Sequence, residues 1–266
     1  MRVLLAQLAP APGDAGANLT TLEDALRQHR DADLALFPEL FLTGYEPARA
    51  RERALDADGE ELRRVARAAR ANGTSVIVGF AERTPDRTLN SVAVFDGDGT
   101  SLGTYAKTHL FGANEQAAFA PGQTLLTVEI GGARIAPLIC FDTEFPEPAR
   151  AVAAAGAELL VTVAANPRPY GPDQELAVRA RALDNRRPHV YVNRVGEEAG
   201  LVFVGGSCVV TGTGAVVEQL GEHPELRLVD VDLSEAPEPD VDYLKHVRAD
   251  LTVERRDAVA LEGGEG

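Results

Sequence analysis

Three residues capable of nucleophilic and acid–base chemistry follow short apolar runs at similar places in the sequence. Glu39 comes just after the run Leu34 to Phe37, Lys107 ends the run SLGTYAK, and Cys140 follows RIAPLI. An amphipathic run begins directly after Cys140, so first-turn amides and the helix macrodipole at this corner favour a thiolate. The alternative is that Cys140 is a small apolar residue of the core, which is the commoner place for a free cysteine.

The residue types together match the needs of acyl transfer from a carbon–nitrogen bond. Such a reaction needs a nucleophile, a base that takes its proton, and a positive group or N–H that stabilises the oxyanion. Cys140 fits the nucleophile, Glu39 the base, and Lys107 with the backbone N–H of Phe141 the oxyanion stabiliser. Glu115 can hold Lys107 or help to place the substrate.

Their recurrence at the ends of predicted strands favours a shared site. Taken singly, Glu39 and Lys107 are more often solvated charges. Strand ends at one edge of an open sheet meet at a crevice, where α/β folds usually bind ligands. Three chemically capable residues at such ends therefore point to one crevice.

Composition narrows the classes of protein that fit. The chain has 266 residues, 45% of them hydrophobic, which is enough for one large core and a single domain over residues 1–251. A C-terminal tail over 252–266 follows, and we expect its end after Leu261 to be disordered. A net charge of −15 disfavours nucleic acid or an anionic membrane as a partner; it favours solubility and can attract a cationic substrate. Two cysteines and five scattered histidines disfavour a disulfide scaffold and a structural zinc site.

The opening residues MRVLLAQLAPAP fit neither a signal peptide nor a transmembrane helix, so we expect a cytoplasmic protein.

Alternating apolar runs and amphipathic stretches predict an α/β fold with paired sheets flanked by helices. We expect Asn18 to cap the first helix, Asp142 to cap the helix after Cys140, and residues 109–122 to form a loop. His109 and Cys208 are interpreted as packing residues. The main elements are expected as strands at 2–7, 34–37, 89–96, 134–139, 159–164 and 226–233, and as helices at about 18–30, 59–72 and 173–187.

Three segments carry a resemblance to a known family. FPELFLTGY surrounds Glu39, YAKTHLFG surrounds Lys107, and LICFDTEFPEPAR surrounds Cys140. In this order, and with Glu115 and FAPG after Lys107, they resemble the nitrilase superfamily of carbon–nitrogen hydrolases over residues 1 to about 251. The resemblance implies a four-layer αββα sandwich, a Glu39–Lys107–Cys140 triad with Glu115 as an acidic helper, no metal or organic cofactor, and homo-oligomers.

Within the superfamily, the segments KTHLFG, AANPRPYGPD and VRARALDN look most similar to aliphatic amidases of the 5-aminopentanamidase type. In relatives the segment corresponding to residues 164–170 shapes the acyl pocket, so the resemblance makes Asn166 and Tyr170 candidate substrate-binding residues. Phe141 and Thr143, next to Cys140, are the other two candidates.

The expected function is cysteine-dependent hydrolysis of a small linear primary amide, aliphatic or ω-amino, to a carboxylic acid and ammonia through a thioester. Alternatives with the same triad are an N-carbamoyl amine or amino-acid hydrolase and a nitrilase; an ammonia-donating partner of a synthetase is another. A catalytically silent scaffold is the alternative from a different class, and the presence of all four candidate catalytic residues argues against it. The chain from Ala236 onward, which includes this tail and has Tyr243, Leu244 and Val247 spaced for a docking helix, predicts a homodimer or larger assembly.

Overall fold

The computed structural model describes residues 1–234, 241–248 and 250–254, and its strands form two large sheets. The first sheet has six strands, in the order β14 (Glu225–Asp230), β1 (Arg2–Gln7), β2 (Leu34–Leu36), β3 (Ser75–Arg83), β4 (Thr88–Phe95) and β5 (Ser101–Ala106). The second has six strands, in the order β13 (Val216–Gln219), β12 (Cys208–Val210), β9 (His189–Asn193), β8 (Leu159–Ala164), β7 (Ala133–Ile139) and β6 (Val128–Ile130). A separate hairpin joins β10 (Val195–Glu198) to β11 (Leu201–Val204).

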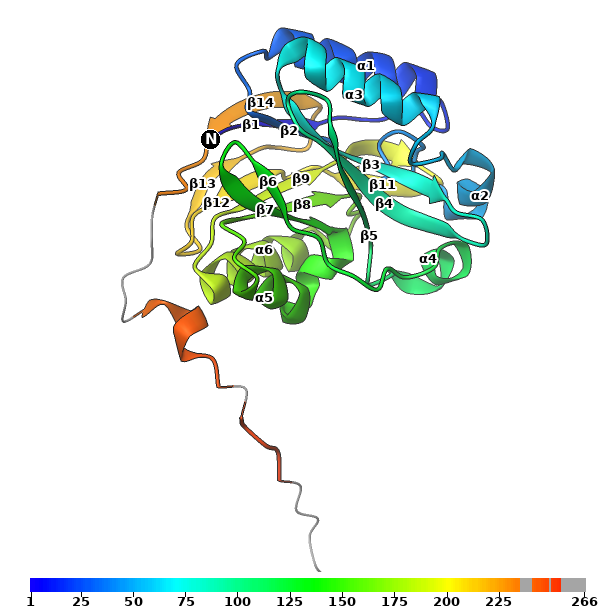
Figure 1. Cartoon of the computed structure of the whole chain (residues 1–266). Helices are drawn as coiled ribbons and strands as arrows, with labels where there is room; N and C mark the ends of the chain where they lie inside the picture. The colour runs from blue at the N-terminus through cyan, green and yellow to red at the C-terminus, as the bar shows by residue number, and fades with distance from the viewer. Residues whose placement is uncertain (235–240, 249, 255–266) are drawn as a thin grey trace, which may run out of the picture.

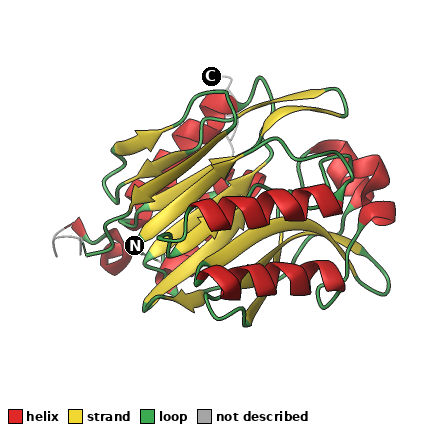
Figure 2. Ribbon diagram, turned by 90° about the horizontal axis from the view of Figure 1, so that it is seen from above, coloured by secondary structure: helices red, strands yellow, loops and turns green. Residues whose placement is uncertain are grey.

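The two sheets pack face to face and helices cover their outer faces, so the predicted four-layer αββα sandwich is confirmed (Figure 1). Helices α1 (Ala15–Gln28) and α3 (Glu60–Asn72) lie side by side over the first sheet (Figure 2). Helices α5 (Pro146–Ala154) and α6 (Gly171–Asn185) cover the second sheet (Figure 1). The central core contains residues of both sheets, among them Val3, Leu36, Ile77, Ile135, Val161 and Val190, all with no exposed surface.

The order of strands brings the three predicted strand ends to one edge. Strands β1, β2 and β3 are parallel, and β5 is antiparallel to β4, which is antiparallel to β3. The strand preceding Lys107 therefore runs in the same direction as the strand preceding Glu39. In the second sheet β7, β8 and β9 are parallel, and Cys140 follows β7 at their carboxyl ends. A crevice at carboxyl ends is the usual place for a site in α/β folds.

Local capping differs from the sequence prediction at the first helix. Asp14 caps α1, accepting a hydrogen bond from the N–H of Ala17. Asn18, the expected cap, is buried; it exchanges hydrogen bonds with the backbone of Ala11 and donates to the carbonyl of Leu42. The prediction for Asn18 was wrong because a tertiary contact, rather than a local cap, uses its amide. The helix predicted at 59–72 agrees with α3, and Gly73 ends it in the left-handed conformation with φ 68°.

Several short elements were not predicted. The expected loop at 109–122 contains α4 (Gly112–Ala118), and a turn η1 (Pro47–Arg49) leads into α2 (Ala50–Arg53) after the Glu39 segment. The helix expected directly after Cys140 is a five-residue 3₁₀ turn, η2 (Cys140–Glu144), followed by α5. These short pieces line the edge where the candidate residues meet.

The described part of the tail forms a 3₁₀ turn, η4 (Tyr243–His246), instead of the predicted docking helix. The guanidinium of Arg186, at the end of α6, lies 4.3 Å from the centre of the Tyr243 ring. This part of the tail therefore packs on the chain's own α6. The predicted assembly stays a prediction, and the tail end predicted to be disordered, after Leu261, lies outside the described residues. Among the described helices, none has the length and apolar character needed to cross a bilayer.

Candidate active site

A buried lysine lies between two carboxylates at the shared carboxyl edge. Lys107 Nζ is 2.7 Å from Glu39 Oε1 and 2.9 Å from Glu115 Oε2. Lys107 and Glu39 have no exposed surface, and Glu115 is 1% exposed. Charges so deeply buried are tolerated only when they are paired and hydrogen-bonded. The structure therefore brings together three of the four residues that the sequence singled out.

Glu39 is held by a tight turn and by hydrogen bonds to both of its oxygens. Asn90 Nδ2 donates to Oε1 at 2.6 Å, and the N–H of Ala165 donates to Oε2 at 2.8 Å. The chain turns at Leu40 with φ 52° and passes close over β3 at Gly79. A Cβ at Gly79 would lie 2.4 Å from the backbone nitrogen of Leu40, so only glycine leaves room for this turn.

Helix α4 supplies Glu115, and two further donors fix its carboxylate. The N–H of Phe111 donates to Oε2 at 2.8 Å, and the hydroxyl of Tyr45 donates to Oε1 at 2.5 Å. Tyr45 is 5% exposed, and its own N–H donates to Glu198 Oε2. Sequence reasoning missed Tyr45, although it ends the FPELFLTGY segment. Its place in that segment, six residues after Glu39, was the available signal.

Cys140 begins η2 directly after β7 and is 7% exposed. Its φ is 45°, a conformation that a non-glycine residue rarely adopts, and such residues cluster at functional sites. The backbone of Ala165, which donates to Glu39, also lowers the Cys140 pKa, and Glu39, Lys107 and Glu115 all act on the thiol electrostatically. The thiol therefore lies at the charged cluster.

The resting protonation state differs from the expectation of a thiolate. Burial, with the nearby Glu39 and Glu115 carboxylates, raises the pKa of Cys140 well above its ordinary value, and Lys107 only partly opposes this. A turn of five residues has too small a dipole to offset that burial. The resting nucleophile is a thiol and needs a base. Burial also raises the pKa of Glu39, with the Lys107 charge opposing it.

Lys107 keeps its proton. Burial by itself lowers the pKa of Lys107, but the carboxylates of Glu115 and Glu39 outweigh it and hold that pKa well above its ordinary value. A permanent ammonium next to a neutral thiol is suited to stabilising negative charge that develops during a reaction. It is not suited to acting as the proton acceptor.

Asp142 anchors the Lys107 segment instead of capping α5. Its Oδ1 accepts from the N–H groups of Thr108 and His109 at 3.1 and 2.8 Å, and its Oδ2 accepts from the Tyr105 hydroxyl at 2.6 Å. The predicted cap holds only for η2, because Asp142 Oδ2 also accepts from the N–H of Ile139, which precedes that turn; α5 starts later and has no side-chain cap. This carboxylate ties the Cys140 turn to the residues that follow Lys107.

This constellation has counterparts among known proteins. Residues 2–238 match the carbon-nitrogen hydrolase family. The chain belongs to that family. It is 38% identical to an (R)-stereoselective amidase of Pseudomonas sp over 260 residues, which cover 96% of this chain and 94% of the relative. It is also 32% identical over 243 residues to the N-carbamoylputrescine amidase of Solanum lycopersicum, covering 81% of each chain.

Solved structures of family members agree with the fold. The NitN amidase of Nesterenkonia sp. AN1 superposes with a TM-score of 0.85 at 34% identity, covering 94% of this chain and 97% of the other. A cysteine-to-alanine variant of that amidase is known in complex with butyramide, with the same TM-score, 33% identity and 94% coverage of both chains. As a carbon-nitrogen hydrolase with amidase relatives, the chain is an enzyme that acts on amides by cysteine-dependent hydrolysis. This finding disfavours the silent scaffold.

Aromatic rings gather on one side of the hydrolase's cysteine turn. The Phe111 ring contacts Phe141 and Tyr170 edge to face, each at 5.3 Å between centres, and Phe141 contacts Phe145 at 5.0 Å. Tyr170 is 39% exposed, so the cluster reaches the surface. Two of the predicted pocket residues, Phe141 and Tyr170, thus contact the same ring, that of Phe111, and Phe141 directly follows Cys140 in the chain. A third, Asn166, is 4% exposed, and its amide donates to the carbonyl of Tyr170.

Thr143, the fourth predicted pocket residue, has another contact. It is fully buried, and its hydroxyl lies 2.8 Å from the hydroxyl of Thr162, which in turn lies 2.8 Å from Nε2 of the buried His189. Burial lowers the pKa of His189 to about 3, so this imidazole is neutral. Thr143 therefore fastens η2 to β8, and the predicted substrate contact is not supported for it.

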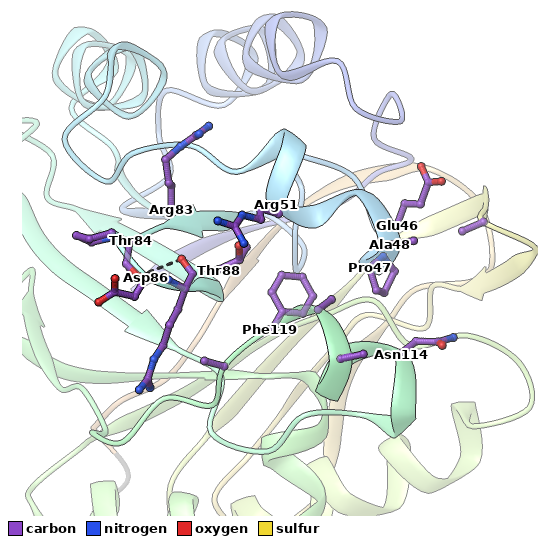
Figure 3. Close-up of a pocket in the computed structure, with 16 residues that line it drawn as sticks. Glu46, Pro47, Ala48, Arg51, Arg83, Thr84, Asp86, Thr88, Asn114 and Phe119 are labelled. Atoms are coloured by element: carbon purple, nitrogen blue, oxygen red, sulfur yellow. Dashed lines mark hydrogen bonds between the residues drawn. The ribbon is translucent and has the colours of Figure 1, made fainter.

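Two cavities have linings that include none of the four candidate catalytic residues. A groove of about 990 Å³ is lined by residues of α2, α4 and the turn after β3, with Phe119 between Arg51 and α4, and by none of the four candidate catalytic residues (Figure 3). A cavity of about 340 Å³ is lined by Asn166, Tyr191 and Cys208 together with the start of α6.

The described residues contain no group of three or more His, Cys, Asp or Glu side chains arranged to hold a metal ion. The two carboxylates nearest the thiol are bridged by Lys107, whose ammonium takes the place that a cation would need.

Proposed function

We propose that this hydrolase converts primary amides of short linear acids to the carboxylic acid and ammonia, with Cys140 as nucleophile, Glu39 as general base and acid, and Lys107 as electrostatic stabiliser. The observation that carries the proposal is the Lys107 ammonium held between Glu39 and Glu115, next to a thiol that is neutral at rest. Lys107 and Cys140 hold their protons, as their roles require, and Glu39 takes the Cys140 proton when it is ionised.

In the first half-reaction, Glu39 takes the Cys140 proton as sulfur bonds to the amide carbon. The carbonyl oxygen becomes an oxyanion, which Lys107 and the N–H of Phe141 stabilise. Phe141 lies in the first turn of η2, where the leading amides have no partner within the turn. When the carbon–nitrogen bond breaks, Glu39 returns its proton to the nitrogen, so ammonia leaves and a thioester remains on Cys140.

In the second half-reaction, water attacks the thioester carbon and gives a proton to Glu39. The carbon–sulfur bond then breaks, the carboxylic acid leaves, and Glu39 returns the proton to the sulfur of Cys140. The same carboxylate thus serves each step in turn, as microscopic reversibility requires. Glu115 and Tyr45 act through Lys107 by fixing its ammonium.

The surroundings of the site favour an amide over an anionic N-carbamoyl amino acid. Binding a carboxylate strongly needs a free guanidinium. Arg168 pairs with Glu222 at the surface, where both side chains are about 60% exposed. Arg194 is 1% exposed, bonds to Glu198 at 2.6 Å and stacks on Phe203. Both arginines are engaged, and the rings of Phe111, Phe141 and Tyr170 suit a short apolar acyl chain.

The test is ammonia release from matched compounds at one enzyme concentration. The panel contains butyramide, pentanamide, the matching nitriles, N-carbamoylputrescine and an N-carbamoyl amino acid. We expect the highest kcat/KM for an amide. A higher kcat/KM for a carbamoyl compound would favour the activity named for the Solanum relative, and a higher value for a nitrile would make this chain a nitrilase.

A further inference from the structure

Asn90 presents a buried side-chain amide to the carboxylate of the general base. It lies on β4 with Val92 and Val94, whose side chains belong to the core between the two sheets. Since side chains alternate between the two faces of a strand, Asn90 faces the same interior. The residue is 1% exposed, and its Nδ2 donates to Glu39 Oε1 at 2.6 Å. Strand β4 therefore carries this amide to the catalytic carboxylate.

The other polar atom of the Asn90 amide has no partner among the residues that the structure describes. Its Oδ1 is buried and accepts no hydrogen bond there. An ionised carboxylate can only accept, so Nδ2, and not Oδ1, must face Glu39. A buried acceptor without a donor costs free energy. The amide therefore destabilises the fold at one atom while it supplies a donor to Glu39.

The two oxygens of Glu39 have unequal surroundings. Oε1 accepts from Asn90 Nδ2 at 2.6 Å and from Lys107 Nζ at 2.7 Å. A carboxylate oxygen has about two lone pairs that can accept, so these two bonds fill Oε1. Oε2 accepts from the N–H of Ala165 at 2.8 Å, and residues 1–234, 241–248 and 250–254 provide no second donor to it. One acceptor position of Oε2 is therefore open.

The open oxygen is the one beside the thiol. The backbone of Ala165, whose N–H donates to Glu39 Oε2, also hydrogen-bonds to Cys140 and lowers the pKa of that thiol. Two acceptors within reach of one N–H lie next to each other. A proton can therefore pass between Cys140 and Oε2 while both hydrogen bonds to Oε1 stay in place.

We propose that Asn90 is a positioning residue for the general base: together with Lys107 it occupies Glu39 Oε1, so that Oε2 exchanges the proton with Cys140. This assignment rests on the proposed mechanism and adds to it a residue that takes no proton itself. The Asn90 amide also favours the ionised form of Glu39 and lowers its pKa, because it donates to the charged carboxylate. The backbone carbonyl of Asn90 accepts from the N–H of Lys107 at 2.8 Å, so the same residue holds the chain at both partners.

Charged and titratable groups from several elements act on Glu39 or are acted on by it. They are Lys107, Glu115, Cys140, Tyr45, Tyr191 and Arg194. The pKa values of the lysine, the thiol and both phenols are raised, so these four groups keep their protons at acidic pH. Arg194 is bonded to Glu198 and stays charged. Glu115 is the other carboxylate, but the Asn90 amide donates to Glu39. A change at Asn90 therefore acts on the acidic side of the pH profile through Glu39.

The test measures kcat/KM for butyramide against pH in Asn90→Leu, which has a side chain of similar size without the donor. The ionised form of Glu39 loses a hydrogen bond, so its pKa rises, and the acidic midpoint should move to higher pH by about one unit. The plateau kcat should fall by about tenfold with little change in KM, since Oε1 is held by Lys107 alone. Asn90→Ala, with a smaller side chain, should give the same shift.

Asn185 is the matched control because it has the same kind of amide away from the catalytic cluster. It is fully buried at the end of α6, its Nδ2 donates to the carbonyl of Arg181 at 2.8 Å, and its Oδ1 has no partner in the described ranges. Asn185→Leu may change the melting temperature only, so its acidic midpoint should equal that of the wild type. An unmoved midpoint in both Asn90 variants, or an equal shift in Asn185→Leu, would overturn the assignment.

Alkylation of Cys140 by iodoacetamide gives a second readout that does not need amide turnover. Its rate should fall as Glu39 is protonated, so the acidic midpoint of alkylation should show the same shift in Asn90→Leu, with the Cys208 peptide as internal reference. If the wild-type chain hydrolysed no amide, the proposed function would fail, and the alkylation profile would still decide the role of Asn90. Identical alkylation profiles in the wild type and Asn90→Leu would contradict that role.

Discussion

The free cysteines, Cys140 and Cys208, are both buried, yet their surroundings differ completely. Burial raises the pKa of both thiols, that of Cys208 to about 12. Neither is a thiolate at neutral pH, so acidity does not separate them. Cys208 lies in β12 opposite Tyr191, and the charged group named among the causes of its pKa shift is Glu175. Cys140 lies beside Glu39 and Lys107.

The comparison shows that neighbours, rather than an already ionised sulfur, make a buried thiol a nucleophile. At Cys140 a carboxylate can take the proton at the moment of attack, and an ammonium can receive the charge that develops. At Cys208 no such pair is present among the groups that act on its pKa.

Replacing each cysteine in turn should have opposite effects on amide hydrolysis. Cys140→Ala should abolish amide hydrolysis, because no other group can form the thioester, whereas Cys208→Ala should keep most of the wild-type kcat/KM. Ammonia release measures both. Normal turnover by Cys140→Ala would refute the mechanism.

Removing the neighbours of Cys140 should make it resemble Cys208. Glu39→Gln and Lys107→Met should each lower kcat by at least about a hundredfold, the scale of general-base or oxyanion assistance. The circular-dichroism spectrum should stay native in both. Glu129→Gln, an exposed acid in β6, is the control and should behave as wild type. Full activity in either test variant would remove the role assigned to that residue.

The sequence predicts the contrast only in part, and the reason is distance along the chain. Glu39, Lys107 and Cys140 each follow an apolar run, so their common edge could be inferred locally. Tyr45 donates to Glu115, which is 70 residues away in the sequence, and Asn90 donates to Glu39, which is 51 residues away. No local sequence pattern predicts either hydrogen bond. The donors that fix the carboxylates therefore appear only once the chain is folded.

Predictions of helix ends from the local sequence were wrong where residues distant in the chain supply the hydrogen-bond donors. Asp142 lies where a cap of α5 is expected, but most of its hydrogen bonds come from Tyr105, Thr108 and His109. Helix α4 was not predicted because it has only seven residues and no side-chain cap. The architecture of paired sheets, which depends on long apolar runs, was predictable; the short pieces around the site were not.

A smaller effect should follow from loosening Lys107 without removing it. Tyr45→Phe deletes the hydroxyl that donates to Glu115 Oε1, and we expect kcat to fall by about tenfold with little change in KM, because a hydrogen bond to a charged group is lost. Tyr243→Phe, in the tail, is the control and should be silent. If Tyr45→Phe changed only KM, Tyr45 would be identified as a residue that contacts the substrate and not as one that positions Lys107.

The smallest expected effect is the change of kcat/KM with pH. The reaction needs Glu39 ionised, and its pKa is raised, so kcat/KM should fall on acidification with a midpoint above 4.5, the ordinary carboxyl value. Cys140 and Lys107 have raised pKa values and keep their protons, so the plateau should extend on the alkaline side to at least pH 9.0, the ordinary value for a thiol. A steady rise in activity from neutral pH to pH 9.0 would contradict this, because it would show that Cys140 loses its proton to solvent in that range instead of to Glu39 during attack.

The most direct test of the different roles of the two cysteines is to trap the acyl-enzyme intermediate and find which cysteine carries it. The wild-type protein is quenched with acid during turnover of butyramide, digested, and its two cysteine-containing peptides are weighed by mass spectrometry. The mechanism predicts a butyryl mass increase on the Cys140 peptide and none on the Cys208 peptide, and no increase on either in Cys140→Ala. A butyryl group on Cys208, or turnover with no acyl group on Cys140, would contradict it.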